Sequence, residues 1–446
     1  MKRFAYFFWR SLHSSPIVKW ISGVLVASTL FALSPIRDIR LGYLHADSLG
    51  GFIAQADLAL VLLPKLGNSD RHSAKNLFVL PLRHSNPFVV QQYIELIQEF
   101  PSTSVLGTSN DLVQKAVRLA ALGLEHVAIR HPRLRRNYCG SPTWEGLDAN
   151  GIEEDGRPRL VIETDVRAQG WDRLSSLGID REKPLICFGN RDFTYWNSQA
   201  RQSGLSEGGD STQDFRNTSI TNYLPGIARL IDAGYTVVRM GAGATASTAL
   251  TDLGVIDYAN SSIQSDVLDV LLFADCDAAI FGGAFGLAQL ALAFHKPICV
   301  TDYRPFIFTE WSTPHCQITP SLLRNMETDE TLNLEKMLQH PYNEQVLYEL
   351  KGIEFVPNTA SDIESSVVEF IEGLEGRGLP YNESDLQREF WGIVAEKRMN
   401  YAWYHRPSGR AVKRYNLFDP LDYGWTRRHS RVSESFLNSH ARELFN

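Results

Sequence analysis

The stretch Ser265–Phe306, SDVLDVLLFADCDAAIFGGAFGLAQLALAFHKPICVTDYRPF, decides the fold of this chain. Helix-like runs at Asp266–Phe273 and Gly286–Phe294 alternate in it with short apolar strand-like runs at 277–283 and 297–303. Strands joined by a crossover helix pair in parallel, and helices then cover the faces of their sheet. The stretch therefore predicts an α/β domain built on a parallel sheet.

The same alternation extends upstream. Strand-like runs occur at 184–190, 235–241 and 254–259, with a helical run at Ile220–Ala233. A first series has strand-like runs at 39–44, 58–63, 76–81 and 103–107 and helical runs at Pro87–Phe100 and Val113–Leu124. Two such series predict two Rossmann-like α/β domains of similar size, with a central cleft where the carboxyl ends of their strands face each other. We expect an apolar and basic segment over 1–38, the two domains over 39–180 and 181–375, and a helical tail over 376–446.

Composition narrows the class of protein. The 446 residues are 44% hydrophobic and 21% charged, which is typical of a globular chain of two or three domains. A net charge of −7 argues against a nucleic-acid partner for the chain as a whole. The five cysteines are scattered without CxxC spacing, so the sequence predicts neither a disulfide framework nor a zinc site.

The first forty residues differ in charge from the remainder. They hold six basic residues against Asp38 alone, and the rest of the chain is acidic. Trp20–Ile36 is uncharged and mostly apolar, but it is marginal in length for crossing a bilayer. A secretory signal, a single span, an interfacial anchor and a helix packed on the protein's own surface are the alternatives. We expect a cytoplasmic body at the inner membrane, helped by basic groups that include Arg130, Arg133, Arg135 and Arg136.

Glycines mark the carboxyl end of one predicted strand. Gly282 and Gly283 close the strand 277–283, and Gly286 and Leu287 open the following helix. Glycines let a backbone approach a ligand closely, and free N–H groups at a helix start favour phosphate. A tight turn without a ligand is the alternative. Asp302 ends the next strand, where its carboxylate is expected at the rim of the cleft.

Arginines follow other strands of the same series. Arg191 and Arg216 flank a loop of about 25 residues, a length usual for functional or disordered segments, and Arg239 ends the strand 235–241. Guanidinium groups pair bidentately with phosphate oxygens, so these arginines suit a pyrophosphate. Surface salt bridges are the alternative for each of them.

Five blocks of sequence resemble a family of bacterial proteins assigned as glycosyltransferases. They are GNRDFTYWN (189–197), FRNTSITNYLPGIARLIDAGYTVVRMG (215–241), IDYANSSIQSDVLDVLL (256–272), GGAFGLA (282–288) and KPICVTDYRPF (296–306). REFWGIV (388–394) and SESFLNSHAREL (433–444) are similar to its closing elements. The resemblance implies GT-B architecture, with a nucleotide-sugar donor on the second domain and the acceptor on the first.

Matching positions extend this implication to individual residues. The family's motifs fall on Arg191 with Asp192, Arg216 with Asn217, Arg239 with Gly241, Asp257 with Tyr258, Ser265 with Asp266 and Asp269, and Gly286 with Leu287. The chain departs from the family at Ser219, Phe285 and Asp302. Phe285 removes a hydroxyl that could bond a phosphate, which leaves that contact to backbone N–H groups.

The resemblance implies transfer of a sugar from a nucleotide-diphosphate sugar to a glycan or lipid-linked acceptor of surface polysaccharide or lipopolysaccharide. Such a reaction needs a base for the acceptor hydroxyl. His45 and Asp47 directly follow the strand 39–44 and are the candidates, with His84 third. We expect no metal, although Asp275 and Asp277 form a D-x-D, and no cofactor, although 241–246 fits a dinucleotide fingerprint. An epimerase of the same fold and a non-catalytic nucleotide- or carbohydrate-binding protein remain as alternatives.

Overall fold

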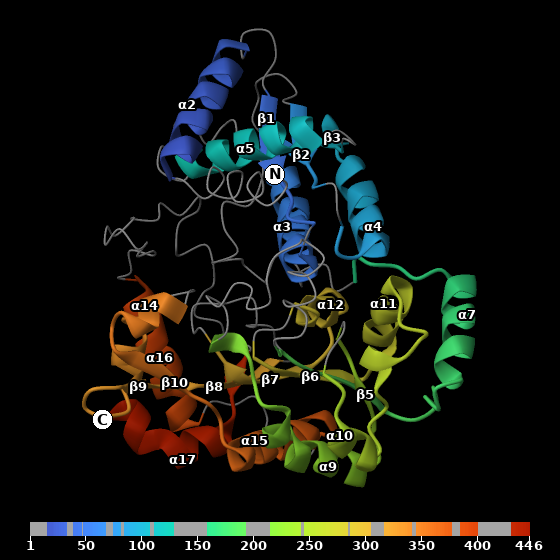
Figure 1. The fold of residues 1–446 in the computed structure, drawn as a ribbon, viewed down its shortest axis with the longest axis vertical. Coiled ribbons are helices and arrows are strands. Elements are labelled where there is room, and N and C mark those ends of the chain that lie inside the picture. Colours follow the sequence, from blue (N-terminus) through green and yellow to red (C-terminus); the bar gives the residue numbers. More distant parts are fainter. Residues whose placement is uncertain are drawn as a thin grey trace, which may run out of the picture. The chain divides into compact units, whose positions relative to one another are not determined.

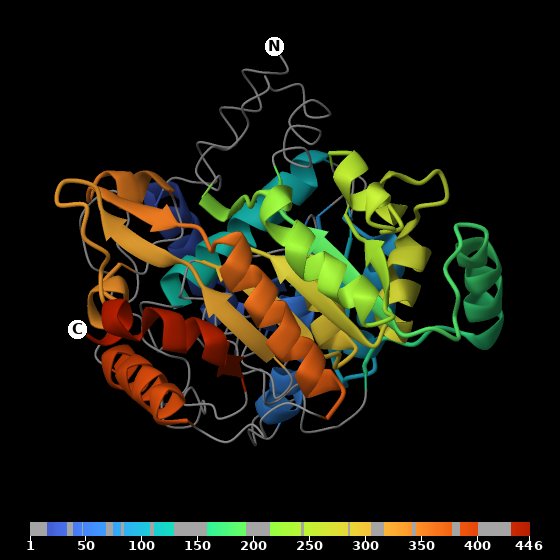
Figure 2. The same ribbon diagram turned by 90° about the horizontal axis from the view of Figure 1, so that it is seen from below.

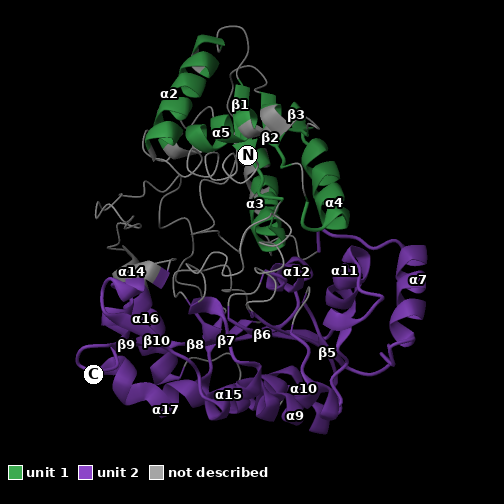
Figure 3. Cartoon of the chain, in the orientation of Figure 1, with its two compact units in different colours: residues 1–156, 414–423 green, residues 157–413, 424–446 purple. Residues whose placement is uncertain are grey.

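A computed structural model gives the fold (Figure 1). It describes residues 16–33, 39–46, 48–67, 75–81, 84–107, 111–128, 158–192, 215–241, 245–283, 286–304, 316–340, 345–376, 384–399 and 430–446. The chain divides into two compact units (Figure 3): unit 1 comprises 1–156 and 414–423, and unit 2 comprises 157–413 and 424–446. Each contains a parallel sheet covered by helices, which confirms the predicted α/β class.

Unit 1 is built on three parallel strands. They are β1 (Ile39–Tyr43), β2 (Lys75–Val79) and β3 (Thr103–Leu106), in that spatial order. The helices are α2 (Pro16–Leu33), α3 (Leu49–Gly67), α4 (Pro87–Gln98) and α5 (Asp111–Ala128). Local signals set α4, because Asn86 accepts a hydrogen bond from Val89 N and Pro87 occupies the first turn.

One predicted strand of unit 1 is wrong. Residues 58–63 form the second half of α3, a helix whose apolar side chains include the fully buried Phe52, Ile53 and Ala56. Residues 50–57 of this helix are all buried, including the polar Gln55 and Asp57, so this part of α3 is covered on every side, as in a protein core. A short apolar run taken alone does not distinguish such a helix from a buried strand.

Helix α2 packs on α5 within unit 1. Ala27 and Leu30 are buried against Leu124 and Val127. The structure therefore has the apolar N-terminal run as a helix with one side packed on the protein's own surface. None of the helices in the described part of the chain is long and apolar enough to cross a membrane.

Unit 2 contains a six-stranded parallel sheet in the order β11-β8-β7-β6-β4-β5. Its strands are β4 (Leu185–Asn190), β5 (Thr236–Arg239), β6 (Ala278–Gly282), β7 (Ile298–Tyr303), β8 (Cys316–Pro320) and β11 (Arg431–Val432). A separate two-stranded sheet pairs β9 (Leu322–Asn325) antiparallel with β10 (Ile353–Val356). The apolar runs of β4, β6 and β7 are buried throughout, as parallel strands covered on both faces require. The strand expected at 254–259 is reduced to one bridge between Val238 and Ile256.

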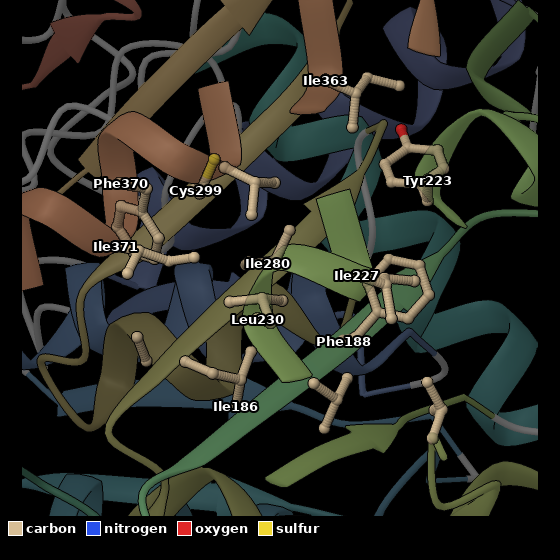
Figure 4. Packing of buried hydrophobic residues seen from close by; sticks show 14 of the residues in the cluster. Ile186, Phe188, Tyr223, Ile227, Leu230, Ile280, Cys299, Ile363, Phe370 and Ile371 are labelled. Atoms are coloured by element: carbon tan, nitrogen blue, oxygen red, sulfur yellow. The ribbon is translucent and has the colours of Figure 1, made fainter. Parts of the chain in front are cut away.

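Helices cover both faces of this sheet. The helices and 3-10 turns described in unit 2 are α7 (Thr164–Ser175), η3 (Ile220–Tyr223), α9 (Leu224–Asp232), α10 (Thr248–Asp252), η4 (Tyr258–Asn260), α11 (Asp266–Asp275), α12 (Ala288–Ala293), α13 (Leu334–Met337), α14 (Gln345–Glu349), α15 (Ala360–Leu374), α16 (Asp385–Met399) and α17 (Glu434–Phe445). Helices α9 and α15 lie side by side on one face (Figure 2), and α11 and α12 contact the strands from the other (Figure 1). Figure 4 shows the core between the first pair and the sheet, where Ile186 and Ile280 meet Leu230 and Phe370.

Residues 158–180 belong to unit 2 by their contacts, although the sequence grouped them with the first domain. Helix α7, which the sequence analysis missed, packs on α11. Arg167 and the indole N–H of Trp171 both donate to Asp275 at the end of α11. The partners in these contacts are more than 100 residues apart in the sequence, so the local sequence around α7 does not predict them.

The C-terminal segment also packs on unit 2. Strand β11 pairs with β8, and Glu369 of α15 accepts hydrogen bonds from Glu434 N and Ser435 N at the start of α17. Arg431 forms an ion pair with Glu369. A pocket of 720 Å³ lies beside this contact, and none of the predicted site residues lines it.

Candidate functional site at the carboxyl edge of the unit 2 sheet

The predicted donor residues gather at one edge of the unit 2 sheet. Arg191 and Asp192 follow β4, Gly241 follows β5, Gly283 follows β6, and Asp302 lies at the end of β7. Strand β4 has β5 on one side and β6 on the other, so the strand order reverses between β4 and β6. Open α/β sheets bind ligands outside the carboxyl ends of their strands at such a switch point.

Arg239 joins three of the predicted blocks. Its side chain is buried, with the guanidinium Nη1 2.6 Å from the carbonyl of Thr245 and 3.8 Å from Asp257. Asp192 accepts a hydrogen bond from Thr245 N at 3.0 Å. Burial lowers the pKa of Arg239, and the carboxylates of Asp257 and Asp192 oppose that shift. Arg239 therefore braces the chain around 245 and is not exposed at the edge.

A second group surrounds the start of α11. Ser265 caps the helix through Leu268 N, and the Tyr258 hydroxyl donates to the Ser265 carbonyl at 3.3 Å. Gln264 connects this group to the end of β5 through the carbonyl of Gly241 at 2.5 Å. Asp269, in the first turn, has a pKa raised to about 7, first by burial and further by the charge of Asp266, while hydrogen bonds from Tyr258 and Gln264 oppose the shift.

Other parts of the chain fill the space beside the two glycines at the end of β6, Gly282 and Gly283. A Cβ built on Gly282 would lie 2.8 Å from Thr218 Oγ1 and would collide with the ring of Tyr223. Gly283 has φ +73°, and a Cβ there would lie 2.5 Å from the carbonyl of Arg216. The segment around 216–218 is further held by Thr218 N, which donates to Arg191 O at 2.9 Å. The close approach predicted for these glycines is therefore made by the chain itself.

The predicted position of Asp302 at the rim of the cleft is wrong. Its side chain is buried, because internal hydrogen-bond donors surround the carboxylate. Oδ1 accepts from Ser321 Oγ at 3.1 Å and from Asn358 N at 2.8 Å, and Oδ2 accepts from Tyr223 OH at 3.2 Å. Arg304 lies 3.7 Å from Oδ1. The backbone of Asp302 has φ +51°, and its N–H donates to Asn358 Oδ1.

Arg304 carries this network back to the switch point. Its Nη2 donates to the carbonyl of Asn217 at 2.8 Å, so the Arg216–Asn217 pair is tied to the end of β7. Arg191 and Arg216 are half-buried, in contrast to Arg239 and Arg304. They are the two predicted arginines with side chains at the surface of this edge.

The remaining predicted residues lie elsewhere or outside the described part. Gly286 and Leu287 precede α12. The candidate bases His45 and His84 belong to unit 1, where they follow β1 and β2. The backbone N–H of His45 donates to Gln55 Oε1, and its ring contacts the ring of Tyr43 edge-on. Asp47, Phe285, residues 242–244 of the fingerprint-like run and the arginines at 130, 133, 135 and 136 lie outside the described residues.

The D-x-D carboxylates serve the fold. Asp275 binds Arg167 and Trp171 of α7, and Asp277 Oδ2 accepts from Leu185 N at 2.7 Å at the start of β4. Across the described ranges, no group of three or more His, Cys, Asp or Glu residues could hold a metal ion.

Sequence reasoning missed Tyr223, Arg304 and Asn358. The first two lie inside the quoted blocks and could have been noted there. Asn358 follows β10, far from any recognisable pattern, so only the folded chain brings it to Asp302.

No protein-family model matches the chain, and a comparison with curated proteins finds no match. Among solved structures, a glycosyl transferase family 9 protein of Veillonella parvula DSM 2008 is similar at a TM-score of 0.33 and 11% identity, over 64% of this chain and 86% of that one. Two structures of the dodecameric iron-containing glycosyltransferase TibC, one in complex with ADP-D-β-D-heptose and the other described as from enterotoxigenic E. coli H10407, are similar at 0.33, with 12% and 13% identity over 76% of this chain and 77% of those. A likeness at this TM-score carries no conclusion about this chain.

Proposed function

We propose that the protein is a GT-B-type glycosyltransferase that binds a nucleotide-diphosphate sugar at the carboxyl edge of the unit 2 sheet. The convergence of separate motif blocks supports this proposal. Asp192 meets Thr245 beside Arg239 and Asp257, and Gln264 joins Gly241 to the start of α11. Blocks that lie apart in the sequence thus form one network of polar contacts next to a topological switch point.

Arg191 and Arg216 are the residues to which we assign the diphosphate. They lie at the switch point, and guanidinium groups stabilise the charge that a leaving diphosphate develops. Arg239 and Arg304 act as positioning residues, because their guanidinium groups are buried in internal hydrogen bonds. The proposed reaction uses no metal. Asp266 and Asp269 line the adjoining part of the proposed site, and Tyr258, which is buried, acts as a positioning residue through its hydrogen bond to the Ser265 carbonyl.

The first experiment is a thermal-shift panel on the full chain with UDP, GDP, CMP, ADP and NAD. A ligand at 100 times its Kd adds about 2.7 kcal/mol to the stability of the folded state. We expect one nucleoside diphosphate to stabilise the protein, and Arg216→Ala to abolish that shift. Arg229→Ala is the matched control, because Arg229 is an exposed arginine of α9 paired with Glu364.

Silence across the panel would contradict the proposal. Stabilisation by NAD alone would instead favour a dinucleotide site at 241–246. Stabilisation by a nucleoside diphosphate without donor turnover would favour the non-catalytic binding protein. A labelled donor separates the third alternative, because an epimerase changes the sugar without needing an acceptor.

His45 is our proposed base for the acceptor hydroxyl, with Asp47 as its partner candidate and His84 third. Imidazole is the side chain that most often serves as a general base. We expect His45→Ala to lower kcat for transfer by at least about a hundredfold, the usual scale for a lost general base. Donor binding in the thermal-shift assay should be unchanged. Near wild-type turnover in His45→Ala and in Asp47→Ala would remove both residues from the reaction.

The acceptor we propose is a glycan or lipid-linked glycan of a surface polysaccharide or lipopolysaccharide, reached by a cytoplasmic enzyme at the inner membrane. The basic N-terminal forty residues support this part of the proposal, because anionic lipid attracts such segments. Transfer to lipid-extracted acceptor, measured with radiolabelled donor, tests it directly.

A further inference from the structure

Helix α2 has two apolar faces, and one of them is used inside unit 1. Gly23, Ala27 and Leu30 are buried against α5. A Cβ on Gly23 would collide with the backbone of Gly123, so the two helices touch at a pair of glycines. Ser22 Oγ adds a hydrogen bond to the carbonyl of Leu119 at 2.9 Å. This close packing fixes which way the other face of α2 points.

The opposite face is exposed and apolar. Ile17 is 70% exposed, Trp20 49%, Ile21 48% and Leu25 63%. Spacings of three and four residues make these side chains neighbours on the helix surface. At about 100° per residue, Ile21 and Leu25 lie about 160° from Gly23, whereas Trp20 lies at the border between the exposed and the buried face. Single exposed apolar residues are ordinary, whereas a contiguous row of four marks an interaction surface.

Charge identifies what covers this surface. Lys2, Arg3, Arg10, Lys19, Arg37 and Arg40 surround α2 in the sequence, against Asp38 alone. The remainder of the chain is acidic, because the whole chain has a net charge of −7. Another acidic protein surface could satisfy the charges but not a flat row of Ile, Trp and Leu. An anionic lipid bilayer satisfies both, since it offers phosphate at its surface and hydrocarbon just below.

We propose that α2 lies in the plane of an anionic lipid surface, with Ile17, Trp20, Ile21 and Leu25 inserted and α5 on its other side. An in-plane helix needs one apolar face and not the length of a span, which agrees with the helix of the structure. Trp20 is suited to the interface, because its indole combines an apolar body with a polar N–H. This surface belongs to unit 1 and does not depend on the nucleotide site proposed in unit 2.

The test is co-sedimentation of the full chain with vesicles of phosphatidylglycerol and phosphatidylcholine, compared with vesicles of phosphatidylcholine alone. We expect the wild type to bind the anionic vesicles at least tenfold more tightly. The double variant Ile21→Glu/Leu25→Glu should lose at least tenfold of that binding. Leu350→Glu is the control, because Leu350 is an equally apolar side chain, 73% exposed, in unit 2. Its binding should equal that of the wild type.

Two results would overturn the proposal. One is equal vesicle binding by the wild type and the double variant at equal melting temperature. The other is self-association of the lipid-free wild type in sedimentation velocity that the double variant abolishes, because a second copy of the chain would then cover the face. No nucleotide is present in either measurement, so failure of the transferase proposal leaves this test intact.

Discussion

The hydroxyl of Tyr223 lies 3.2 Å from Oδ2 of Asp302, and both side chains are buried at the carboxyl edge of the unit 2 sheet. The same hydroxyl accepts from Thr301 Oγ1 at 3.0 Å. Burial raises the pKa of Tyr223, and the charge of Asp302 raises it further, so the tyrosine remains a hydrogen-bond donor. This pair connects the start of α9 to the end of β7 beneath the Gly282–Gly283 turn.

Replacing Asp302 by Asn should strongly destabilise unit 2. The variant keeps the shape of the side chain but removes the carboxylate beside the buried guanidinium of Arg304, a loss that costs about 3–5 kcal/mol when a buried ion pair is broken. Urea unfolding measures the difference. Asp329→Asn is the control, because Asp329 also has positive φ while its side chain is 84% exposed. Equal unfolding midpoints for the two variants would contradict the central place of Asp302.

Gly283→Ala should cost more stability than Gly254→Ala. Both glycines have positive φ, +73° and +94°, which costs an alanine about 1–2 kcal/mol. Only at Gly283 would the new methyl group meet backbone, at 2.5 Å from Arg216 O, whereas nothing lies within 4 Å at Gly254. We expect thermal unfolding to show at least about 1 kcal/mol of extra loss for Gly283→Ala, the usual cost of overpacking. Equal losses of stability would mean that the 216–218 segment moves away from the new methyl group at no cost, which would contradict this expectation.

Asp269 should make the protein less stable as pH rises. Its pKa, raised to about 7, exceeds the unfolded value of about 4, so the folded state binds an extra proton between those two pH values. The resulting stabilisation is complete below about pH 4, falls as pH rises across this range and is absent above about pH 7. Asp269→Asn should therefore raise the unfolding midpoint at pH 8.5 and change it little at pH 4.5. Asp385→Asn, in the first turn of α16 and 93% exposed, is the control and should change neither. An Asp269→Asn variant that is less stable at pH 8.5 would contradict the expectation.

His440 should change stability with pH in the same direction, through its contact with α15. Nε2 lies 3.1 Å from Asp362 Oδ1, and the hydrogen bond to this carboxylate raises the pKa of His440. Its stabilisation is then complete below about pH 6.5 and lost as pH rises through the raised pKa. We expect His440→Gln to lower stability by about 0.5–1 kcal/mol at pH 6 and by less at pH 8.5.

His340 is the comparison for that measurement, because its contribution to stability changes with pH in the opposite direction. Burial lowers the pKa of His340, followed by the charge of Lys351, so protonation of this histidine disfavours the folded state at low pH. Relative to the wild type, the His340→Gln variant should therefore be more stable at pH 6 than at pH 8.5. The same pH trend in both variants would point to a general effect of net charge and not to these two contacts.

The sequence by itself determined the α/β class and most of the strands that carry the site. The runs at 184–190, 277–283 and 297–303 are apolar, short and bounded by turn residues, as expected for strands, and they form β4, β6 and β7. It also determined which residues follow those strands, because the carboxyl ends of parallel strands share one edge. Arg191, Asp192 and Asp302 reach that edge for this reason.

Tertiary structure alone decided what each of those residues does. Arg239 and Asp302 have the same local pattern as edge residues but are buried, because Thr245, Asn358 and Ser321 arrive from distant parts of the chain. The 58–63 run continues the helix that begins at Leu49, whose residues 50–57 are all buried, and a short apolar run by itself does not show this. Hydrogen bonding and burial depend on neighbours in space, and the local sequence does not contain them.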